Sequence, residues 1–340
     1  MGRLVLVEGM RHGERICAPV LLFSPGGVMM GLSKARKGAT AMKNVLVTGG
    51  TTFVSRFVAE YFVKKGDAVF VINRGSKAQS AGVRHIRADR HALGDSLRGM
   101  HFDLVVDVTA YTAEDVNLLL DALDSYGDYV LISSSAVYPE TAPQPFPEST
   151  ALGLNRFWGK YGTDKIEAEE ALHGRDPRGY ILRPPYLYGP MNNVYREAFV
   201  FECAEKNRPF YLPGDGGMQL QFFHVEDLCR FVDALLEQKP EERIYNVGNP
   251  ETVSVREWVE LCYRATGKQP EFVNVHADVE QRKYFSFYNY EYKLDVSRQQ
   301  ALMPDVKPLA DGLREAFAWW RENPDGVVKK PLMEFIDRNL

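Results

Sequence analysis

The chain has 340 residues, enough for one large or two small domains with a buried core, and its 45% hydrophobic and 25% charged residues are ordinary globular values. This composition excludes a disordered, collagen-like or disulfide-framework protein. The 41 Lys and Arg against 45 Asp and Glu give a formal net charge of −4. That balance gives no electrostatic reason to expect a nucleic acid or an anionic membrane as partner.

The cysteines and the N-terminal region bear on the compartment. The four cysteines are far apart and form no CxxC or Cys/His cluster, so we expect reduced thiols, a cytoplasmic protein and no metal site. The apolar stretch at 17–32 is interrupted by Ser-Pro-Gly-Gly and is too short to span a bilayer, and no signal peptide is recognised. Residues 1–42 lack sustained periodicity. We expect them to be a disordered or non-native extension, with the functional chain starting at Met42.

From residue 44 onward, short apolar segments alternate with helical patterns. The apolar segments are rich in β-branched and aromatic residues, as buried parallel strands are, and lie at 45–47, 68–72, 104–108, 129–132 and 180–182. Helical patterns occupy 53–62, ended by Gly66, and 113–123. The alternation predicts an α/β fold with a doubly wound parallel (Rossmann) sheet, which makes residues 43–190 a dinucleotide-binding domain.

After residue 190 the rhythm changes. Helical patterns at 194–204, 225–236, 253–265 and 309–321 are joined by short strands at 222–224 and 244–247. We expect a smaller α+β lobe over 191–325, mainly for substrate binding and with strands free to return to the first domain. Residues 326–340 are expected to form a C-terminal tail.

A glycine turn follows the first predicted strand. Such a turn before a helix leaves backbone N–H groups free to hold a pyrophosphate, and the helix dipole helps. We therefore expect cofactor contacts from five consecutive residues: Gly49, Gly50, Thr51, Thr52 and Phe53. A tight turn without a ligand is the alternative.

The end of the second strand bears on the choice of cofactor. An acidic residue there would bind the ribose 2′-OH of NAD, whereas an arginine accommodates the 2′-phosphate of NADP. This chain has Asn73 and Arg74, which favours NADP, and a solvated loop is the alternative. Asp89, at the end of the third strand, is the expected adenine contact.

A tyrosine and a lysine four residues apart, Tyr161 and Lys165, share one helical face. A neighbouring ammonium stabilises a phenolate and lowers its pKa from about 10, which makes tyrosine a usable general acid/base. Three serines at 133–135 end a buried strand, where a doubly wound sheet places its chemistry. A surface Tyr/Lys pair is the alternative.

These motifs resemble the extended short-chain dehydrogenase/reductase superfamily, in particular its NAD(P)-dependent nucleotide-sugar epimerase/dehydratase branch. The resemblance covers about residues 43–322. Besides the glycine turn and the Tyr/Lys pair it rests on five motifs in family order: SSSAVY at 133–138, LRPPYLYGP at 182–190, GDG at 214–216, HVED at 224–227 and YNVG at 245–248.

The resemblance implies roles for individual residues. Tyr161 would be the catalytic acid/base, Lys165 would bind the nicotinamide ribose and tune Tyr161, and Ser134 would be the catalytic hydroxyl, with Ser135 as the alternative. It also implies cofactor contacts at Thr109, Ala110 and Pro184, and substrate contacts at Ser135, Tyr186 and Asn192.

The chain departs from the family pattern at several places. Thr52 and Ser55 stand where the family has glycine, and Leu220 stands where it has an arginine that commonly grips a nucleotide diphosphate. Arg282 and Lys283 could substitute for the lost arginine, or could belong to a solvated loop. The aromatic run at 284–292 is interpreted either as a stacking platform or as filling between the lobes, and His224 as structural.

The expected function is that of a nucleotide-sugar epimerase working through a transient keto intermediate with NAD as cofactor. The Asp-Glu pair of the dehydratases is replaced by Ser135-Ala136, which disfavours elimination. One alternative is an NAD(P)H-dependent reductase of a small carbonyl compound. Another is a non-catalytic nucleotide-sensing or RNA-binding member resembling the chloroplast stem-loop-binding proteins, against which the net negative charge argues. Family analogy also predicts a homodimer, with no membrane partner.

Overall fold

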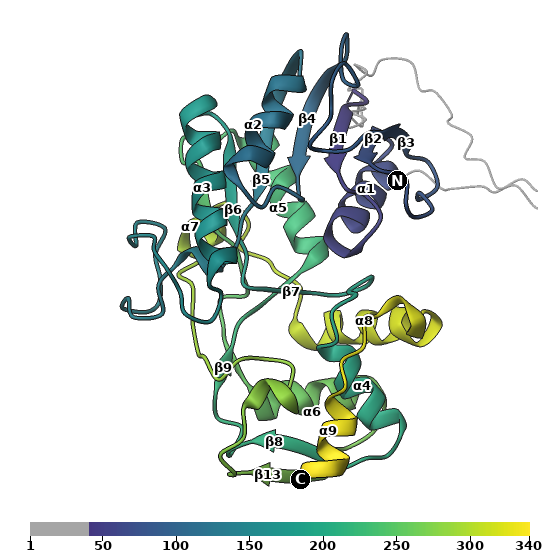
Figure 1. Cartoon of the computed structure of the whole chain (residues 1–340), viewed down its shortest axis with the longest axis vertical. Helices are drawn as coiled ribbons and strands as arrows, with labels where there is room; N and C mark the ends of the chain where they lie inside the picture. Colours follow the sequence, from purple (N-terminus) through teal and green to yellow (C-terminus); the bar gives the residue numbers. More distant parts are fainter. Residues whose placement is uncertain (1–40) are drawn as a thin grey trace, which may run out of the picture. The chain divides into compact units, whose positions relative to one another are not determined.

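A seven-stranded sheet dominates the first part of the fold (Figure 1). The computed structural model describes residues 41–340, so the prediction of an extension over 1–42 concerns residues almost wholly outside it. Neighbouring strands are parallel throughout, in the order β11-β6-β5-β4-β1-β2-β3. The predicted doubly wound sheet is confirmed. Its strands are β1 (Asn44–Thr48), β2 (Ala68–Asn73), β3 (Arg84–Arg87), β4 (His101–Asp107), β5 (Ser125–Ile132), β6 (Tyr180–Arg183) and β11 (Ile244–Asn246).

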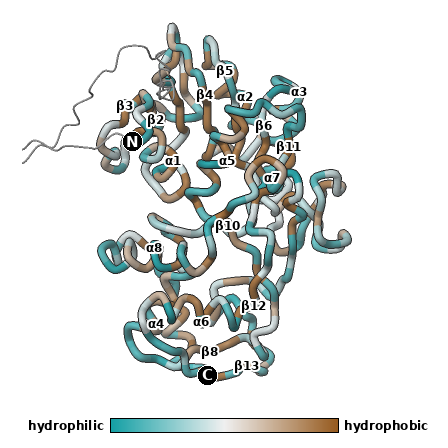
Figure 2. Tube along the Cα trace, turned by 180° about the vertical axis from the view of Figure 1, so that it is seen from behind, coloured by the Kyte–Doolittle hydropathy of each residue, from teal (hydrophilic) through white to brown (hydrophobic). Residues whose placement is uncertain are grey.

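Helices cover both faces of this sheet. Val45 and Val47 of β1 belong to a core shared with α1 (Phe53–Lys65) and α5 (Val225–Gln238), whereas Leu46 belongs to a core shared with two other helices, α2 (Ala113–Ala122) and α3 (Lys160–Arg175). Successive residues of a strand point to opposite faces, so a sheet covered on both sides needs continuous apolar runs. The central strands are accordingly brown, that is hydrophobic, in Figure 2.

The second part of the fold is built around an aromatic-rich core. It contains α4 (Glu197–Glu205), α6 (Val255–Ala265), α8 (Leu309–Glu322) and α9 (Leu332–Asn339), with three strand pairs and three short 3-10 helices. The strand pairs are β7 (Tyr186–Tyr188) with β10 (Phe222–His224), β8 (Phe210–Pro213) with β13 (Phe272–Val275), and β9 (Gln219–Leu220) with β12 (Val253–Ser254); the 3-10 helices are η1 (Ser135–Val137), η2 (Gln281–Lys283) and η3 (Pro324–Gly326).

One strand of the C-terminal half returns to the first domain, as the sequence analysis allowed, and two other segments differ from the sequence expectations. The strand expected at 244–247 in the smaller lobe is β11, the edge strand of the main sheet, and α5 and α7 (Ser297–Leu302) return to that sheet with it. Residues 253–254 are not helical, because they pair with β9 and Ser254 caps α6 in a capping box with Glu257. The segment expected as a tail contains α9, whose buried side chains join the second core. Within residues 41–340, no helix combines the length and apolar character of a membrane span.

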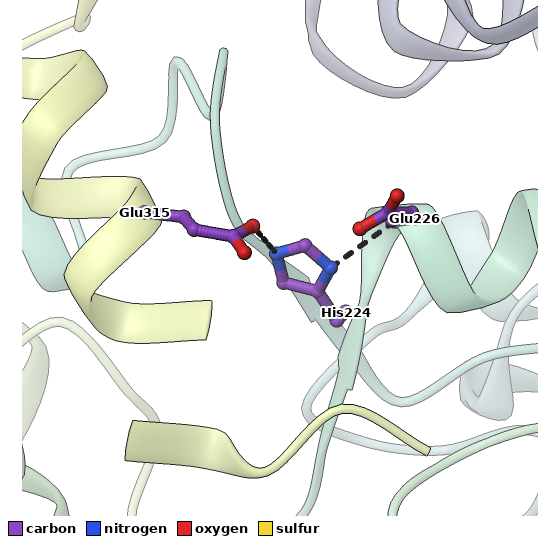
Figure 3. Close-up of side chains that lie close together, drawn as sticks. All are labelled: His224, Glu226 and Glu315. Atoms are coloured by element: carbon purple, nitrogen blue, oxygen red, sulfur yellow. Dashed lines mark hydrogen bonds and ion pairs between the residues drawn. The ribbon is translucent and has the colours of Figure 1, made fainter. Parts of the chain in front are cut away.

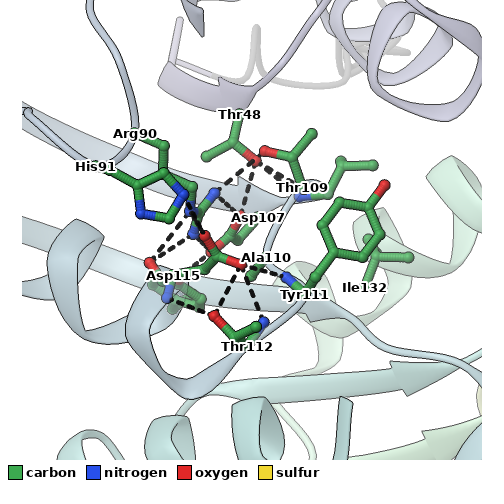
Figure 4. Close-up of polar contacts among 12 residues, drawn as sticks. Thr48, Arg90, His91, Asp107, Thr109, Ala110, Tyr111, Thr112, Asp115 and Ile132 are labelled. Carbon is green, nitrogen blue, oxygen red and sulfur yellow. Dashed lines mark hydrogen bonds and ion pairs between the residues drawn. The ribbon is translucent and has the colours of Figure 1, made fainter. Parts of the chain in front are cut away.

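A buried ion pair fastens the loop that follows β4 (Figure 4). The carboxylate of Asp107 is fully buried and accepts two hydrogen bonds from the Arg90 guanidinium, at 2.8 and 2.6 Å. Thr48 and Tyr129 also donate to it, at 2.8 and 2.6 Å. Burial alone would raise the pKa of Asp107, but the Arg90 charge and these hydrogen bonds hold it below its ordinary value. Arg90 donates onward to the Thr109 hydroxyl, so the pair fixes this loop.

The variant Asp107→Asn tests this anchor. We expect it to lower the free energy of unfolding by about 3 kcal/mol at neutral pH, because a largely buried guanidinium loses its counter-charge. The carboxylate has a lowered pKa in the folded state, so its contribution is present above about pH 4 and is lost as the pH falls through the folded value. The free energies of unfolding of the wild type and Asp107→Asn, measured by urea denaturation, should therefore converge as the pH is lowered.

The matched control is Asp95→Asn, which breaks the exposed pair of Asp95 with Arg98. It should change the free energy of unfolding by no more than about 1 kcal/mol. An Asp107→Asn protein as stable as this control would contradict the anchoring role.

Candidate active site

The largest group of predicted site residues lines one cavity at the carboxyl edge of the sheet. Its volume is about 540 Å³, within the range of small-molecule sites. Five segments far apart in sequence contribute predicted residues to it: Thr52 and Phe53 of the glycine turn, Thr109, Ser134 and Ser135, Tyr161 and Lys165, and Pro184 and Tyr186.

A second cavity of about 400 Å³ adjoins the first. Gly49, Asn73, Arg74 and Asp89 line it, and all four had been predicted to contact the adenosine half or the phosphates of a dinucleotide. Thr109 and Tyr111 line both cavities, so the loop after β4 forms their shared wall. A ligand with two ends joined by a narrow linker fits such a pair of spaces.

The glycine turn connects β1 to α1 and contributes residues to the lining of both cavities. Gly49 and Gly50 have φ values of +91° and +83°, and a Cβ atom on Gly50 would lie 2.5 Å from the side chain of Val71. None of the described side chains caps the N-terminus of α1, where Thr52 is the N-cap residue. The departure at Ser55 is accommodated locally, because its hydroxyl donates to the Thr52 carbonyl at 2.9 Å.

The three serines after β5 have different surroundings. Ser133 donates to the carboxylate of Glu169, and Ser135 is buried beside Tyr292. Ser134 is only half-buried, accepts from the Ala136 N–H at 3.2 Å, and lies near enough to Tyr161 to lower the pKa of that phenol. Both Ser134 and Ser135 line the cavity, and Ser134 is the one beside Tyr161.

The ammonium of Lys165 is bonded to the main chain. It donates to the carbonyls of Ala110 (2.6 Å) and Ile132 (2.9 Å), and it lies 5.0 Å from the centre of the Tyr111 ring. Burial lowers the pKa of Lys165 to about 8. Burial raises the pKa of Tyr161, while Ser134 and the charge of Arg196 act in the opposite direction. The effect of Lys165 on the pKa of Tyr161 stays a prediction.

The comparisons with known proteins show the family of this chain. Residues 45–248 match the model of the NAD dependent epimerase/dehydratase family, which is more than half of the chain. The chain belongs to this family. A UDP-glucuronate 4-epimerase of Thermodesulfobacterium geofontis is 22% identical over 326 residues, which cover 82% of this chain and 96% of that protein.

Two further proteins are similar to this chain. The chloroplast stem-loop binding protein of 41 kDa b from Arabidopsis thaliana is 28% identical over 306 residues, covering 82% of this chain and 79% of that protein. The crystal structure of UDP-glucose 4-epimerase from Thermotoga maritima, with UDP-glucose, superposes with a TM-score of 0.65 at 18% identity, covering 83% and 99% of the two chains. At 18% identity, the similarity to the Thermotoga maritima structure shows a shared fold.

The residues predicted to contact the adenosine half of the cofactor lie at or near the second cavity, and two of them also make hydrogen bonds within the protein. The Asn73 side chain donates to the Gly49 carbonyl at 2.6 Å and accepts from the Gly75 N–H, so it fastens the glycine turn. Arg74 is exposed at the rim of the second cavity. Asp89 lines that cavity while accepting from the His91 N–H at 3.0 Å.

Four predicted contacts lie outside the lining of both cavities: Gly50, Thr51, Ala110 and Asn192. Asn192 is buried, donates to Glu197 at 2.8 Å and accepts from the Val194 N–H at 3.0 Å, so its amide is already used. Asn193 lines the cavity instead. Ala110 is fully buried and contributes its carbonyl to Lys165.

Sequence reasoning missed several residues of the site, among them two arginines and a tyrosine. Arg90 and Tyr111 line the second cavity, and Arg196 lines the first. Tyr111 directly follows the predicted Thr109-Ala110 strand end, a signal that could have found it. Arg90 and Arg196 stand in loops without a motif. Phe287, Tyr288 and Tyr292 of the aromatic run at 284–292 line the first cavity, and the run also packs in the second core. Stacking of these rings on a ligand stays a prediction.

The cluster of His224, Glu226 and Glu315 has the residue types of a metal site (Figure 3). Lys307 already neutralises it, because its ammonium donates to Glu226 at 2.5 Å and to Glu315 at 2.6 Å. Burial and the Lys307 charge lower the pKa of His224 to about 3, so the ring is neutral. The cluster therefore joins α5 to α8, and the structural interpretation of His224 fits it.

The variant Lys165→Met tests the buried ammonium. The folded protein releases the Lys165 proton near pH 8, whereas an unfolded lysine keeps it until about pH 10.4. Between these values the unfolded state binds more protons, so the stability of the wild type should rise with pH relative to the variant by about 3 kcal/mol. Denaturant titrations across this pH range measure the difference.

Lys160→Met is the matched control, since Lys160 lies on the same helix but is exposed and paired with Asp164. For Lys160→Met we expect no such change with pH in the difference between its free energy of unfolding and that of the wild type. Parallel pH profiles of the Lys165→Met and Lys160→Met proteins would refute the buried, carbonyl-bound state of Lys165.

Proposed function

We propose that this protein is an NAD(P)-dependent enzyme that acts on a nucleotide sugar, most simply an epimerase that forms and reduces a keto intermediate. The observation that carries the proposal is that Ser134 and Tyr161 line one cavity together with Thr52 of the glycine turn. Family membership supports a nicotinamide cofactor, and solved relatives include complexes with NAD.

The described residues fit a dinucleotide. The turn at 49–53 offers uncapped backbone N–H groups of α1 to the pyrophosphate, and glycine at position 50 keeps the backbone free of a side chain that would meet Val71. The second cavity would take the adenosine half beside Arg74 and Asp89. Thr109, Lys165 and Pro184 line the space for the nicotinamide half. When bound, the nicotinamide ring supplies the acceptance and return of a hydride.

The chain's own residues move the proton. Tyr161 would remove the proton of the substrate hydroxyl as the adjoining carbon is oxidised, and would return it when the carbonyl is reduced from the other face. Ser134 would hold the same oxygen by a hydrogen bond. Since burial raises the pKa of Tyr161, ionisation of the phenol requires a nearby positive charge, and Arg196 acts in that direction. A homodimer and a cytoplasmic location remain predictions.

The variant Tyr161→Phe tests the proton transfer. We expect turnover to fall at least about 100-fold, because general acid/base catalysis supplies roughly that factor. The assay incubates the protein with NAD and a panel of UDP-, GDP- and dTDP-sugars, and separates the isomers by anion-exchange chromatography. Tyr126→Phe is the control, since its hydroxyl bonds Asp176 away from the cavity. Full turnover of Tyr161→Phe would exclude the mechanism.

The variant Arg74→Ala tests the cofactor half. An exposed arginine at the end of β2 should recognise a 2′-phosphate, so the substitution should weaken NADPH binding about tenfold and leave NADH binding unchanged. Fluorescence titration of both reduced cofactors measures this. An equal effect on the two would place Arg74 away from the 2′ position.

RNA binding is a second candidate, favoured by the 28% identity to a stem-loop binding protein over 82% of this chain. Electrophoretic mobility shifts with a stem-loop RNA at two salt concentrations test it, because phosphate contacts lose affinity steeply as salt rises. Salt-dependent RNA binding together with no cofactor binding would favour this candidate over the enzyme.

A further inference from the structure

Three cations converge beside the first cavity. Arg196 directly precedes α4, Arg282 lies in η2, and Lys330 lies between η3 and α9. Both arginines line the cavity, whose described lining includes no Asp or Glu. Among residues 41–340, none of the three cations forms an ion pair with a carboxylate.

Contacts hold the arginines in place at this wall. The guanidinium of Arg196 lies 5.2 Å from the centre of the Tyr186 ring and donates to the Leu187 carbonyl at 3.3 Å. That of Arg282 lies 4.7 Å from the centre of the Tyr288 ring. Both rings line the same cavity, so the two charges are held against its surface without being neutralised.

Lys330 belongs to the same electrostatic group. Burial lowers its pKa, and the charges of Arg282 and Arg196 lower it further. Its segment is tied to the loop that carries Arg196, because the Val328 N–H donates to the Asn193 carbonyl at 2.9 Å and Val328 bridges to Val194. Lys330 is exposed and outside the lining of the cavity, and it interacts electrostatically with the two arginines of that lining.

Neighbouring charges are compensated, which sets these three apart. Lys329 is paired with Glu202 and Lys283 with Glu280. Glu197 follows Arg196 in the chain, but its carboxylate accepts from Asn192, and burial raises its pKa. The Arg196 charge lowers the pKa of Glu197 against this effect, yet the two side chains form no ion pair among the described residues.

We propose that Arg196, Arg282 and Lys330 together bind a phosphate or diphosphate group of the substrate. Like charges held in one place repel each other, and an oxyanion between them removes that repulsion. Arginine side chains suit this role because their planar fork bonds two phosphate oxygens at once. The inference rests on the proposed function, and it names residues for the anion where buried Leu220 replaces the arginine of the family pattern.

The test is isothermal titration calorimetry of the full chain with UDP, pyrophosphate and uridine. We expect Arg282→Gln and Lys330→Gln each to weaken UDP and pyrophosphate binding about tenfold or more, as loss of a charged hydrogen bond does. Uridine binding should stay unchanged. Lys283→Gln, next to Arg282 but paired with Glu280, is the matched control and should bind UDP as the wild type does.

Thermal unfolding distinguishes binding from a structural role. Removing one of three repelling cations should not lower the melting temperature of the free Arg282→Gln and Lys330→Gln proteins. Weak UDP binding accompanied by a lowered melting temperature would overturn the proposal, as would unchanged UDP affinity. So would a wild type that binds NADH but neither UDP nor pyrophosphate.

NADH titration of the same samples separates this inference from the proposed function. UDP binding that depends on the three cations, in a protein that binds no NADH or NADPH, would support the anion site and refute the proposed enzyme. Stem-loop RNA that binds through these cations while UDP does not would assign them to RNA and overturn the proposal.

Discussion

Two buried charged side chains of one helix, Lys165 and Glu169, hold α3 against the carboxyl ends of three strands. Lys165 donates to carbonyls that follow β4 and end β5, and Glu169 accepts from Arg183 at the end of β6, at 2.6 Å for the shortest bond. Gly162 permits the close approach, because a Cβ atom there would lie 2.4 Å from the Ala136 carbonyl oxygen. This docking brings Tyr161 to Ser134, and every chemical role proposed for the cavity follows from it.

The loop after β4 is the second element on which the site depends. Arg90, Thr48 and Lys165 bond it from different directions, so the wall shared by the two cavities is fixed by buried charge rather than by packing alone. The cations that line the two cavities are of two kinds. Arg90 pairs with Asp107 and Lys165 donates to main-chain carbonyls, whereas Arg74, Arg196 and Arg282 form no ion pair with another described residue.

The sequence predicted the sheet well because each central strand is covered on both faces and must therefore be apolar throughout. It also located the turn at Gly49 and the Tyr161–Ser134 pair, whose motifs are local in the chain. It failed where pairing is distant: residues 253–254 have helical periodicity but pair with β9, and β11 joins a strand more than sixty residues earlier. The motif position of Asn192 did not predict that its amide would bond Glu197 and the Val194 N–H instead of a ligand.

Sequence by itself determined the fold class, the family and the residue types available for proton transfer, since these are written in periodicity and in short motifs. Only the tertiary structure decided which charged side chains are bonded to partners inside the protein and which of the described ones are not. Lys165 lies four residues from Tyr161 in the chain, yet its ammonium belongs to two carbonyls, while Arg196, thirty-five residues away, acts on the phenol. The physical reason is that burial and electrostatics depend on distances in space, which spacing along a chain does not specify.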